Sequence, residues 1–401
     1  MNKCCIKIPE ILLPNTEDMC AWAVIACDQH TSDEKYWAQL EEYVGKKPSS
    51  LRLILPELYL DGDYSARTKS IFETMRAYRK NGVFKKLPAG FILVERSTPF
   101  SETRYGIVLA VDLECYSYER GNTAAIRASE ATIVERIPPR LKIREDACVE
   151  LPHIMLLYND VNDHVLQPLK SGKEKLPLLY DFELNMGGGH VKGYFIENSE
   201  EIAANLMSLQ TDDGLVFVVG DGNHSLATAK AHWDKIKNSL SEEDKQCHPA
   251  RFALCEAVNV YDKGIRFEPI HRIVKGIDVE AFVRGFPSKG KGQGSLYVSG
   301  KKQPVDIDFD IARAISVTDE YITNFIVAHG GKVDYIHGEE ALKELTENHA
   351  DFVGIALPKM DKKTLFPQVV KYGNFPRKTF SMGESAEKRY YIEAKEITRD
   401  L

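Results

Sequence analysis

The stretch LVFVVGDGNHSLATAKAHW, residues 215–233, decides the fold class of this chain. It begins as an apolar run typical of a buried strand, turns at Gly220–Gly222, and continues with Leu226, Ala229 and Trp233 at helical spacing. The sequence therefore predicts a strand, a tight glycine turn and a helix. Because the first turn of a helix carries backbone N–H groups without intrahelical partners, such a junction commonly binds anions.

Segments on both sides of this junction predict a mixed sheet. GFILVERS (90–97) and RYGIVLAVDLECY (104–116) are strand-like runs joined by a polar turn, which predicts an antiparallel hairpin. HIMLLYND (153–160) and RFALCEAVNVYD (251–262) predict further strands, and YSARTKSIFETMRAYRKN (64–81) predicts an amphipathic helix. Since hairpins occur beside strand–helix–strand order, we expect a mixed α/β (α+β) fold rather than a doubly wound sheet.

The chain has 401 residues, which is enough for more than one hydrophobic core. A boundary near Lys275–Gly276 is indicated by the Gly- and Lys-rich stretch FPSKGKGQGSLYVSGKKQP (286–304) that follows it. We therefore expect an N-terminal mixed α/β domain over residues 1–273 that carries the site, and a smaller C-terminal α/β domain over residues 274–401.

Composition and charge narrow the classes of partner. The net charge of −7 argues against a general nucleic-acid binder. No apolar run has the length of a membrane span, and the N-terminus lacks the signal-peptide pattern, so we expect a cytoplasmic protein with a small-molecule ligand, no nucleic acid and no membrane. The eight cysteines show no CxxC or zinc-site spacing and are interpreted as reduced, mostly buried side chains. The oligomeric state is not indicated.

The turn itself has two rival interpretations. A dinucleotide fingerprint is disfavoured because Ser225 stands where the third glycine would be, and no Gly-Lys-Ser/Thr element of a Walker loop occurs. A plain turn with a capped helix accounts for the glycines and for Asp221 or Asn223 as the cap. It accounts less well for His224, because the positive end of a helix disfavours imidazolium. A ligand-binding turn is therefore favoured, and the plain turn stays open.

A second candidate is the stretch IRASEATIVERIPPR, which sets Glu130 and Glu135 among Arg127, Arg136 and Arg140. A carboxylate among cations suits acid/base chemistry, and arginines suit phosphate. A surface helix held by salt bridges would look the same, and on this stretch alone it is the favoured interpretation.

Two further polar segments contain histidine. Asp28 and His30 in ACDQH could bind a metal ion, although a plain strand exit into a capped helix is favoured. His190 follows NMGGG (185–189), which is either a loop that closes over a ligand or a loop without chemistry. Because no His-x3-His or paired Cys spacing occurs, we predict no intrinsic metal site, whereas Mg²⁺ bridging a nucleotide would need only one or two carboxylates.

Taken in order, these motifs resemble the bacterial family called domain of unknown function 1015. The family's Asp-Gly-His-His-Arg-Tyr motif at a strand–helix junction is matched by Asp221-Gly222-Asn223-His224-Ser225-Leu226, and its His-Glu-x-Thr element by Ser129-Glu130-Ala131-Thr132. Shorter matches follow at Cys27-Asp28, Leu55-Pro56-Glu57, Ile270–Val274 and Pro376–Phe380. The Asp-Gly-His-His-Arg pattern is also similar to the nucleotide-phosphate motif of the ParB/sulfiredoxin fold, whose members include free-serine kinases and sulfinic acid reductases.

This resemblance implies a mixed-sheet core similar to the ParB/sulfiredoxin fold. It also implies a nucleotide-dependent phosphotransferase that uses ATP or ADP with Mg²⁺ and acts on a small hydroxyl-bearing metabolite. By the same analogy the catalytic residues would be Glu130, the base for the substrate hydroxyl, with His224 and Asp221. The residues that bind the nucleotide phosphates would be Gly220, Gly222, Asn223, Ser225, Arg127 and Arg140.

The chain departs from the family pattern at three positions. Asn223 replaces the first histidine of the main motif, Ser225 replaces its arginine, and Ser129 replaces the histidine before Glu130. Serine cannot supply the bidentate charge of arginine. A non-catalytic nucleotide or metabolite sensor and a metal-dependent hydrolase that uses Asp221, His224 and His30 therefore stay open as alternatives.

Overall fold

The computed structural model describes residues 4–31, 33–60, 62–132, 137–290, 292–308 and 310–399. It divides into two compact units. Unit 1 consists of Met1–Ile265 and Glu384–Leu401, and unit 2 consists of Arg266–Gly383. The chain leaves unit 1 once and returns to it, so unit 2 is an insertion. The boundary predicted between residues 273 and 274 falls inside strand β15 (Phe267–Lys275).

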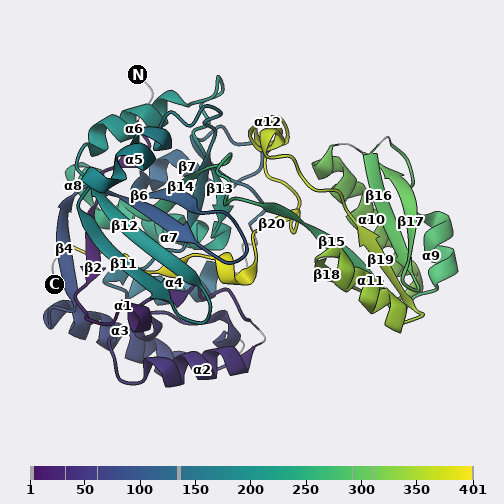
Figure 1. Ribbon diagram of the computed structural model, residues 1–401, viewed down its shortest axis with the longest axis horizontal. Helices are drawn as coiled ribbons and strands as arrows, with labels where there is room; N and C mark the ends of the chain where they lie inside the picture. The colour runs from purple at the N-terminus through teal and green to yellow at the C-terminus, as the bar shows by residue number, and fades with distance from the viewer. Residues whose placement is uncertain are drawn as a thin grey trace. The chain divides into compact units, whose positions relative to one another are not determined.

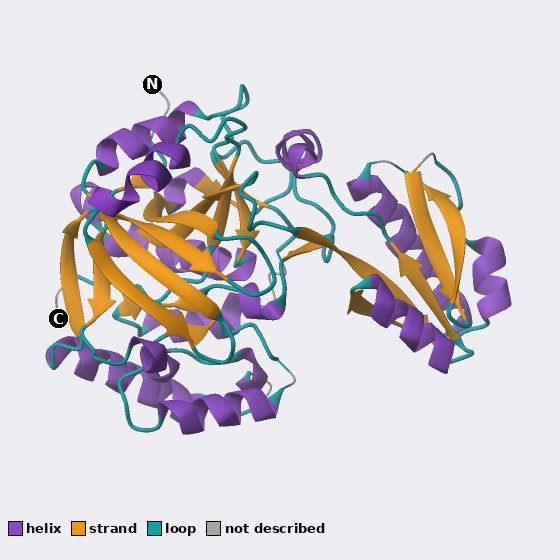
Figure 2. Ribbon diagram, viewed as in Figure 1, coloured by secondary structure: helices purple, strands orange, loops and turns teal. Residues whose placement is uncertain are grey.

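Unit 1 is built around a mixed sheet of ten strands (Figures 1 and 2). Neighbouring strands follow the order β11 (Leu178–Leu184), β12 (Gly189–Ile196), β5 (Phe91–Ser97), β6 (Arg104–Asp112), β14 (Phe252–Asn259), β10 (Met155–Tyr158), β13 (Phe217–Asp221), β8 (Ile126–Ala128) and β7 (Tyr116–Ser117), and β1 (Ile6–Lys7) pairs with β6. The predicted β5–β6 hairpin is antiparallel, whereas β10 runs parallel to β14 and β13 runs parallel to β8. The predicted mixed α/β (α+β) class is confirmed.

Three short strand pairs and the helices complete unit 1. The pairs are β2 (Glu10–Pro14) with β4 (Phe84–Ala89), β3 (Val24–Ile25) with β21 (Tyr390–Tyr391), and β9 (Val149–Glu150) with β22 (Lys395–Glu396). The helices are α1 (Met19–Trp22), α2 (Glu34–Val44), α3 (Ser65–Lys80), α4 (Ile137–Glu145), α5 (Leu166–Gly172), α6 (Ser199–Ser208), α7 (Asn223–Ile236) and α8 (Glu242–Cys247). Figure 1 shows α5 and α6 on one side of the large sheet and α1, α2 and α3 on the other.

The core of unit 1 follows from the apolar patterns of its segments. Phe217 and Val219 of β13 have no exposed surface, because this strand lies inside the sheet. Helix α7 buries Leu226, Ala229 and Trp233, the stripe that its sequence spacing predicted. This stripe fixes the helix against the sheet, so the position of its N-terminus is fixed as well.

Unit 2 has its own sheet, with helices packed beside it (Figure 2). The strands follow the order β17 (Lys301–Ile307), β16 (Gly292–Val298), β19 (Phe352–Ala356), β15 and β18 (Lys332–His337), and β20 (Phe380–Met382) pairs with β15. The helices are α9 (Val279–Gly285), α10 (Ile311–His329), α11 (Glu339–Asn348) and α12 (Leu365–Tyr372). None of the helices in the described parts of the chain is both long and apolar enough to span a membrane.

Candidate functional site

The turn between β13 and α7 requires glycine at position 222. Gly222 has φ of 78°, in the left-handed region, and a Cβ atom there would lie 3.0 Å from the Cα atom of Ile154. Gly222 is the N-cap residue of α7 and has no side chain with which to cap the helix. The N-terminus of a helix is a position at which proteins commonly bind anions.

The turn is joined to the end of β8 through Asn223. The side-chain oxygen of Asn223 accepts a hydrogen bond from the Ser129 backbone N–H at 3.2 Å, and its amide nitrogen donates to Ser129 Oγ at 3.1 Å. Glu130 follows Ser129 directly, so the structure brings the backbone that carries Glu130 beside the turn. Glu135 and Arg136 lie outside the described residues.

Asp221, the last residue of β13, is bonded on both carboxylate oxygens. Its Oδ1 accepts a hydrogen bond from the Gly222 N–H at 2.9 Å, and its Oδ2 lies 3.1 Å from Lys388 Nζ. Lys388 belongs to the segment that returns to unit 1 after the insertion. This contact ties the returning segment to the turn.

A buried histidine lies against the other side of the turn. His153 precedes β10 and is 5% exposed. Its Nε2 atom lies 3.5 Å from Asp28 Oδ2 and 3.3 Å from Ser225 Oγ, while its Nδ1 atom lies 2.8 Å from Tyr391 Oη. Tyr391 in turn donates a hydrogen bond to Cys27 Sγ at 3.1 Å. Residues from four distant parts of the chain therefore meet at one imidazole.

The charges of Asp28 and His153 stabilise each other. Burial lowers the pKa of His153, but the charge of Asp28, its hydrogen bond and the charge of Asp221 outweigh it, so the pKa of His153 is raised. Burial raises the pKa of Asp28, but His153 outweighs it, so the pKa of Asp28 is lowered. A serine-protease-type triad is not formed, because Ser225 and Asp28 share one ring nitrogen.

A cavity of about 170 Å³ opens beside this cluster. Its wall includes Asp28, His153, Ser225 and Tyr391, so the ion pair and the first turn of α7 face the same space. Arg140 also reaches this wall, with its Nη2 atom 2.7 Å from Glu57 Oε1. The wall thus combines one side chain from the first turn of α7, an imidazole with a raised pKa, and paired guanidinium and carboxylate groups.

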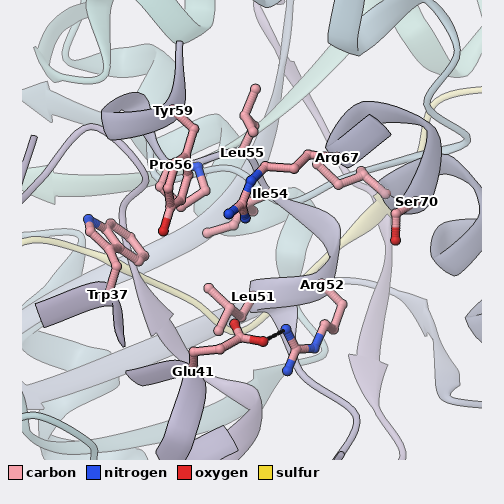
Figure 3. A pocket seen from close by; sticks show the side chains of 11 residues that line it. Trp37, Glu41, Leu51, Arg52, Ile54, Leu55, Pro56, Tyr59, Arg67 and Ser70 are labelled. Atoms are coloured by element: carbon pink, nitrogen blue, oxygen red, sulfur yellow. Dashed lines mark hydrogen bonds and ion pairs between the residues drawn. The ribbon is translucent and has the colours of Figure 1, made fainter. Parts of the chain in front are cut away.

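A second cavity, of about 130 Å³, shares the wall residues Ile54 and Leu55 with the first. Figure 3 shows the Arg67 side chain lying against Tyr59 in it, and the guanidinium carbon is 3.8 Å from the centre of the tyrosine ring. Arg52 forms an ion pair with Glu41 on its other side (Figure 3). This cavity is lined by none of the predicted catalytic or phosphate-binding residues, although Leu55 and Pro56 of the family match Leu55-Pro56-Glu57 belong to its wall.

Three residues that the sequence analysis placed in the site or near it do not contact the cluster formed around His153. Arg127 is 2% exposed and pairs with Asp213 at 2.7 Å; Asp213 precedes β13, whereas the turn follows that strand. His30 stacks on Tyr36 with ring centres 3.7 Å apart, and burial lowers the pKa of His30. His190 pairs with Asp181 at 2.9 Å in the β11–β12 hairpin. Over the described ranges, no three or more His, Cys, Asp or Glu side chains gather in a group that could hold a metal ion.

Sequence reasoning missed His153, Tyr391 and Lys388. His153 opens the predicted strand HIMLLYND, and a histidine at the start of an apolar run was the one local signal. Tyr391 and Lys388 carry no such signal, because they reach the site through the return of the chain into unit 1.

Comparisons with known proteins give a family and distant structural likenesses. No curated protein matches. A conserved hypothetical protein from Pyrococcus furiosus is 12% identical with a TM-score of 0.35, covering 71% of this chain and 93% of that chain. A variant of a free serine kinase in complex with ADP is 9% identical with a TM-score of 0.40, covering 76% and 95%. SbnI with a C-terminal truncation from Staphylococcus aureus is 12% identical with a TM-score of 0.28, covering 59% and 82%.

These structural likenesses are too distant to carry an argument about function. The family comparison does identify the chain, because the model described as "Protein of unknown function (DUF1015)" matches residues 9–335. The chain therefore belongs to the DUF1015 family.

Proposed function

We propose that unit 1 is a nucleotide-dependent phosphotransferase that acts on a small hydroxyl-bearing molecule. One observation carries this proposal: Ser225, in the first turn of α7, lines the same cavity as the Asp28–His153 ion pair. A helix N-terminus favours phosphate, and a protonated imidazole beside it adds a charged donor. Together they favour binding an anion and stabilising charge that develops on it.

Each residue near the turn has a part in this proposal. The backbone of Gly220–Ser225 would hold a phosphate group, and His224 in the first turn of α7 would bond the transferring phosphoryl group. Protonated His153, whose Nε2 atom lies 3.3 Å from Ser225 Oγ, would place a positive charge beside the phosphoryl group. Glu130, carried beside the turn by Ser129, would take the proton of the substrate hydroxyl. The new O–P bond then forms as the bond to the nucleotide's leaving phosphate breaks.

Asp28 is a poor candidate for the base, because its pKa is lowered by His153. It is a better candidate for contact with a magnesium ion, as is Glu57, which lines the same cavity. Both carboxylates already have cationic partners, His153 and Arg140, so Mg²⁺ held mainly by water and phosphate oxygens fits this wall better than a cage of protein ligands. Such an ion would neutralise phosphate charge.

A second candidate is a sensor that binds a nucleotide without turnover. It is favoured by the pairing of Asp221 with Lys388 and of Arg127 with Asp213. The first pairing engages a carboxylate that the resemblance assigns to catalysis, and the second engages a guanidinium that it assigns to phosphate binding. This candidate predicts the same binding with no product.

The test compares thermal unfolding of wild type, His224→Ala and His190→Ala with ATP, ADP and CTP, each with and without Mg²⁺. A ligand at a hundred times its dissociation constant stabilises by about 2.7 kcal/mol. We expect this stabilisation in wild type and in the His190→Ala control, and its loss in His224→Ala. Absence of any nucleotide effect in wild type would contradict the proposal.

A Glu130→Gln variant then separates the two candidates. If the protein is a phosphotransferase, this variant binds nucleotide normally and loses orders of magnitude in turnover. Equal loss of binding and turnover would contradict the role of Glu130 as base. Nucleotide binding by wild type with no transfer to any acceptor in a hydroxyl-compound screen would favour the sensor.

A further inference from the structure

The cavity beside α7 has an extended apolar wall as well as the polar cluster. Six apolar side chains from the N-terminal part of unit 1, α4, the segment after β9 and the C-terminal segment contribute to it: Leu53, Leu60, Met75, Ile143, Leu151 and Ile397. Leu53, Met75 and Ile397 also belong to the main hydrophobic core of unit 1. The apolar wall is thus a continuation of the core.

Part of this apolar surface is not covered by the protein itself. Leu60, Ile143 and Leu151 are only partly buried although they pack against the core. Because apolar surface in a concave wall gains about 25 cal/mol for each Å² removed from water, these side chains favour an apolar occupant.

Helix α4 shows how the two kinds of surface are connected. Arg140 and Ile143 both line the cavity and stand three residues apart, on one face of the helix. On α7, Ser225 and Thr228 line it with the same spacing. Arg144 also reaches the wall, but its Nη2 atom is bonded to Glu150 at 2.5 Å. Polar and apolar contacts are therefore available to one ligand within about one helical turn, or about 5 Å.

We infer that the ligand of this cavity carries an apolar group of about six carbon atoms next to its anionic group. The size follows from the volume of about 170 Å³, since a cavity of about 150 Å³ lined by similar side chains accepts a benzene ring. This inference rests on the proposed anion site at α7 and adds a substrate class to it. The apolar group is either the base of a nucleotide or the hydrocarbon part of the phosphate acceptor.

The experiment measures the affinity of wild type for a series of n-alkyl phosphates from methyl to octyl, by calorimetry at fixed ionic strength. Burial of one methylene group contributes about 0.8 kcal/mol, so we expect affinity to rise roughly fourfold for each added carbon. The rise should end near six carbons, where the cavity is full. Hexanol, which lacks the anionic group, should bind more weakly than hexyl phosphate.

Two further ligands identify the source of the apolar group. AMP binding as tightly as hexyl phosphate, with weak binding of ribose 5-phosphate, supports the inference with the nucleotide base as the apolar group. Hexyl phosphate binding more tightly than AMP supports it with the hydrocarbon part of the acceptor.

The outcomes that overturn the inference are distinct from those that overturn the proposed function. Equal affinity for all alkyl phosphates would contradict the inferred apolar group of the ligand, but it would not contradict the proposed anion site. Binding of hexanol as tight as that of hexyl phosphate would overturn the anion site, and the inference with it.

A pair of variants tests the location. Ile143→Trp should reduce the affinity for hexyl phosphate at least tenfold and leave that for methyl phosphate unchanged, because the indole would fill the apolar part of the cavity. Leu178→Trp, a matched change at a side chain on β11 that is 55% exposed and does not line the cavity, should change neither affinity. Unchanged binding of hexyl phosphate by a folded Ile143→Trp protein would overturn the inference. If that variant does not fold, the alkyl phosphate series measured on wild type tests the inference.

Discussion

Replacement of Asp28 by Asn should destabilise unit 1 in a pH-dependent way. The pKa of His153 is raised in the folded protein, so the protonated imidazole contributes stability that is fully present below its unfolded pKa of about 6.5 and is lost as the pH rises through the folded pKa. The pKa of Asp28 is lowered, so its contribution is present above about pH 4 and is lost as the pH falls through its folded pKa. The pair therefore stabilises most between about pH 4 and 6.5.

The size of the effect follows from the geometry of the pair. A hydrogen bond to a charged group contributes about 1.5–3 kcal/mol. The separation of 3.5 Å and the 31% exposure of the Asp28 side chain place this pair at the low end of that range, or about 1.5 kcal/mol. With a dependence of about 3 kcal/mol per molar urea, the unfolding midpoint should fall by about 0.5 M near pH 6. At pH 9 the difference should be smaller, because the contribution of the protonated imidazole is lost as the pH rises through the folded pKa of His153.

Tryptophan fluorescence is the appropriate assay, because Trp22, Trp37 and Trp233 are the three tryptophans of the chain and all belong to unit 1. Urea titrations at pH 6 and pH 9 then report the unfolding of unit 1 without a contribution from unit 2. Asp181→Asn is the matched control. It removes the partner of His190, a pair in which both side chains are about one-third exposed, and should shift the midpoint by much less.

A shift that is equally large at pH 6 and pH 9 would refute the reasoning, because the charge of His153 would then have no part in it. A midpoint shift in Asp181→Asn as large as that in Asp28→Asn would refute the reasoning as well. Titration of the His153 ring by NMR gives an independent check, since its pKa should fall in Asp28→Asn, where burial remains and the opposing carboxylate is lost.

Three further predictions use the same fluorescence assay or a thiol assay. Gly222→Ala should destabilise unit 1 by about 1–3 kcal/mol more than Gly121→Ala, because both have positive φ but an added Cβ is crowded at 222 and meets nothing within 4 Å at 121; equal losses would contradict the close approach. Arg389→Met should cost about 3–5 kcal/mol, since it removes the cation that pairs with buried Glu393 and one of the two that pair with buried Glu256; a neutral result would show that the returning segment is not held by these ion pairs. In native protein, Cys4 and Cys247, the two exposed cysteines, should react with a thiol reagent much faster than the buried ones; uniform reactivity would contradict the burial.

Local patterns were sufficient to predict the elements around the turn. The strand, the glycine turn and the helix of residues 215–233 follow from side-chain periodicity within one segment, and so does the β5–β6 hairpin. The predicted turn begins two residues too early: the sequence indicated a turn at Gly220–Gly222, whereas β13 continues to Asp221. The reason is that backbone pairing of Asp221 with Met155 extends the strand beyond its apolar run.

The rest of the site depends on contacts that no local pattern encodes. His153 meets Asp28 across 125 positions of the chain and Tyr391 across 238. Pairing of β21 with β3 brings Tyr391 beside the segment that leads to Asp28, and the register of β10 against β13 brings the start of β10 beside the turn. The sequence suggested Asp28 as a metal ligand beside His30, but the imidazole that contacts Asp28 is that of His153, which precedes β10. The roles of Glu130 and His224 stay predictions.

The insertion of unit 2 has a consequence for the order in which the protein can form during translation. Strands β21 and β22 pair with β3 and β9, and the Trp22 indole donates a hydrogen bond to the Ile392 carbonyl at 3.0 Å. The ribosome synthesises all of Arg266–Gly383 before it reaches these strands. Unit 2 is contiguous and can therefore complete its sheet first. Strands β3 and β9 of unit 1 remain unpaired with β21 and β22 until the end of the chain has been synthesised. This order is the reverse of the usual one, in which the N-terminal domain folds first.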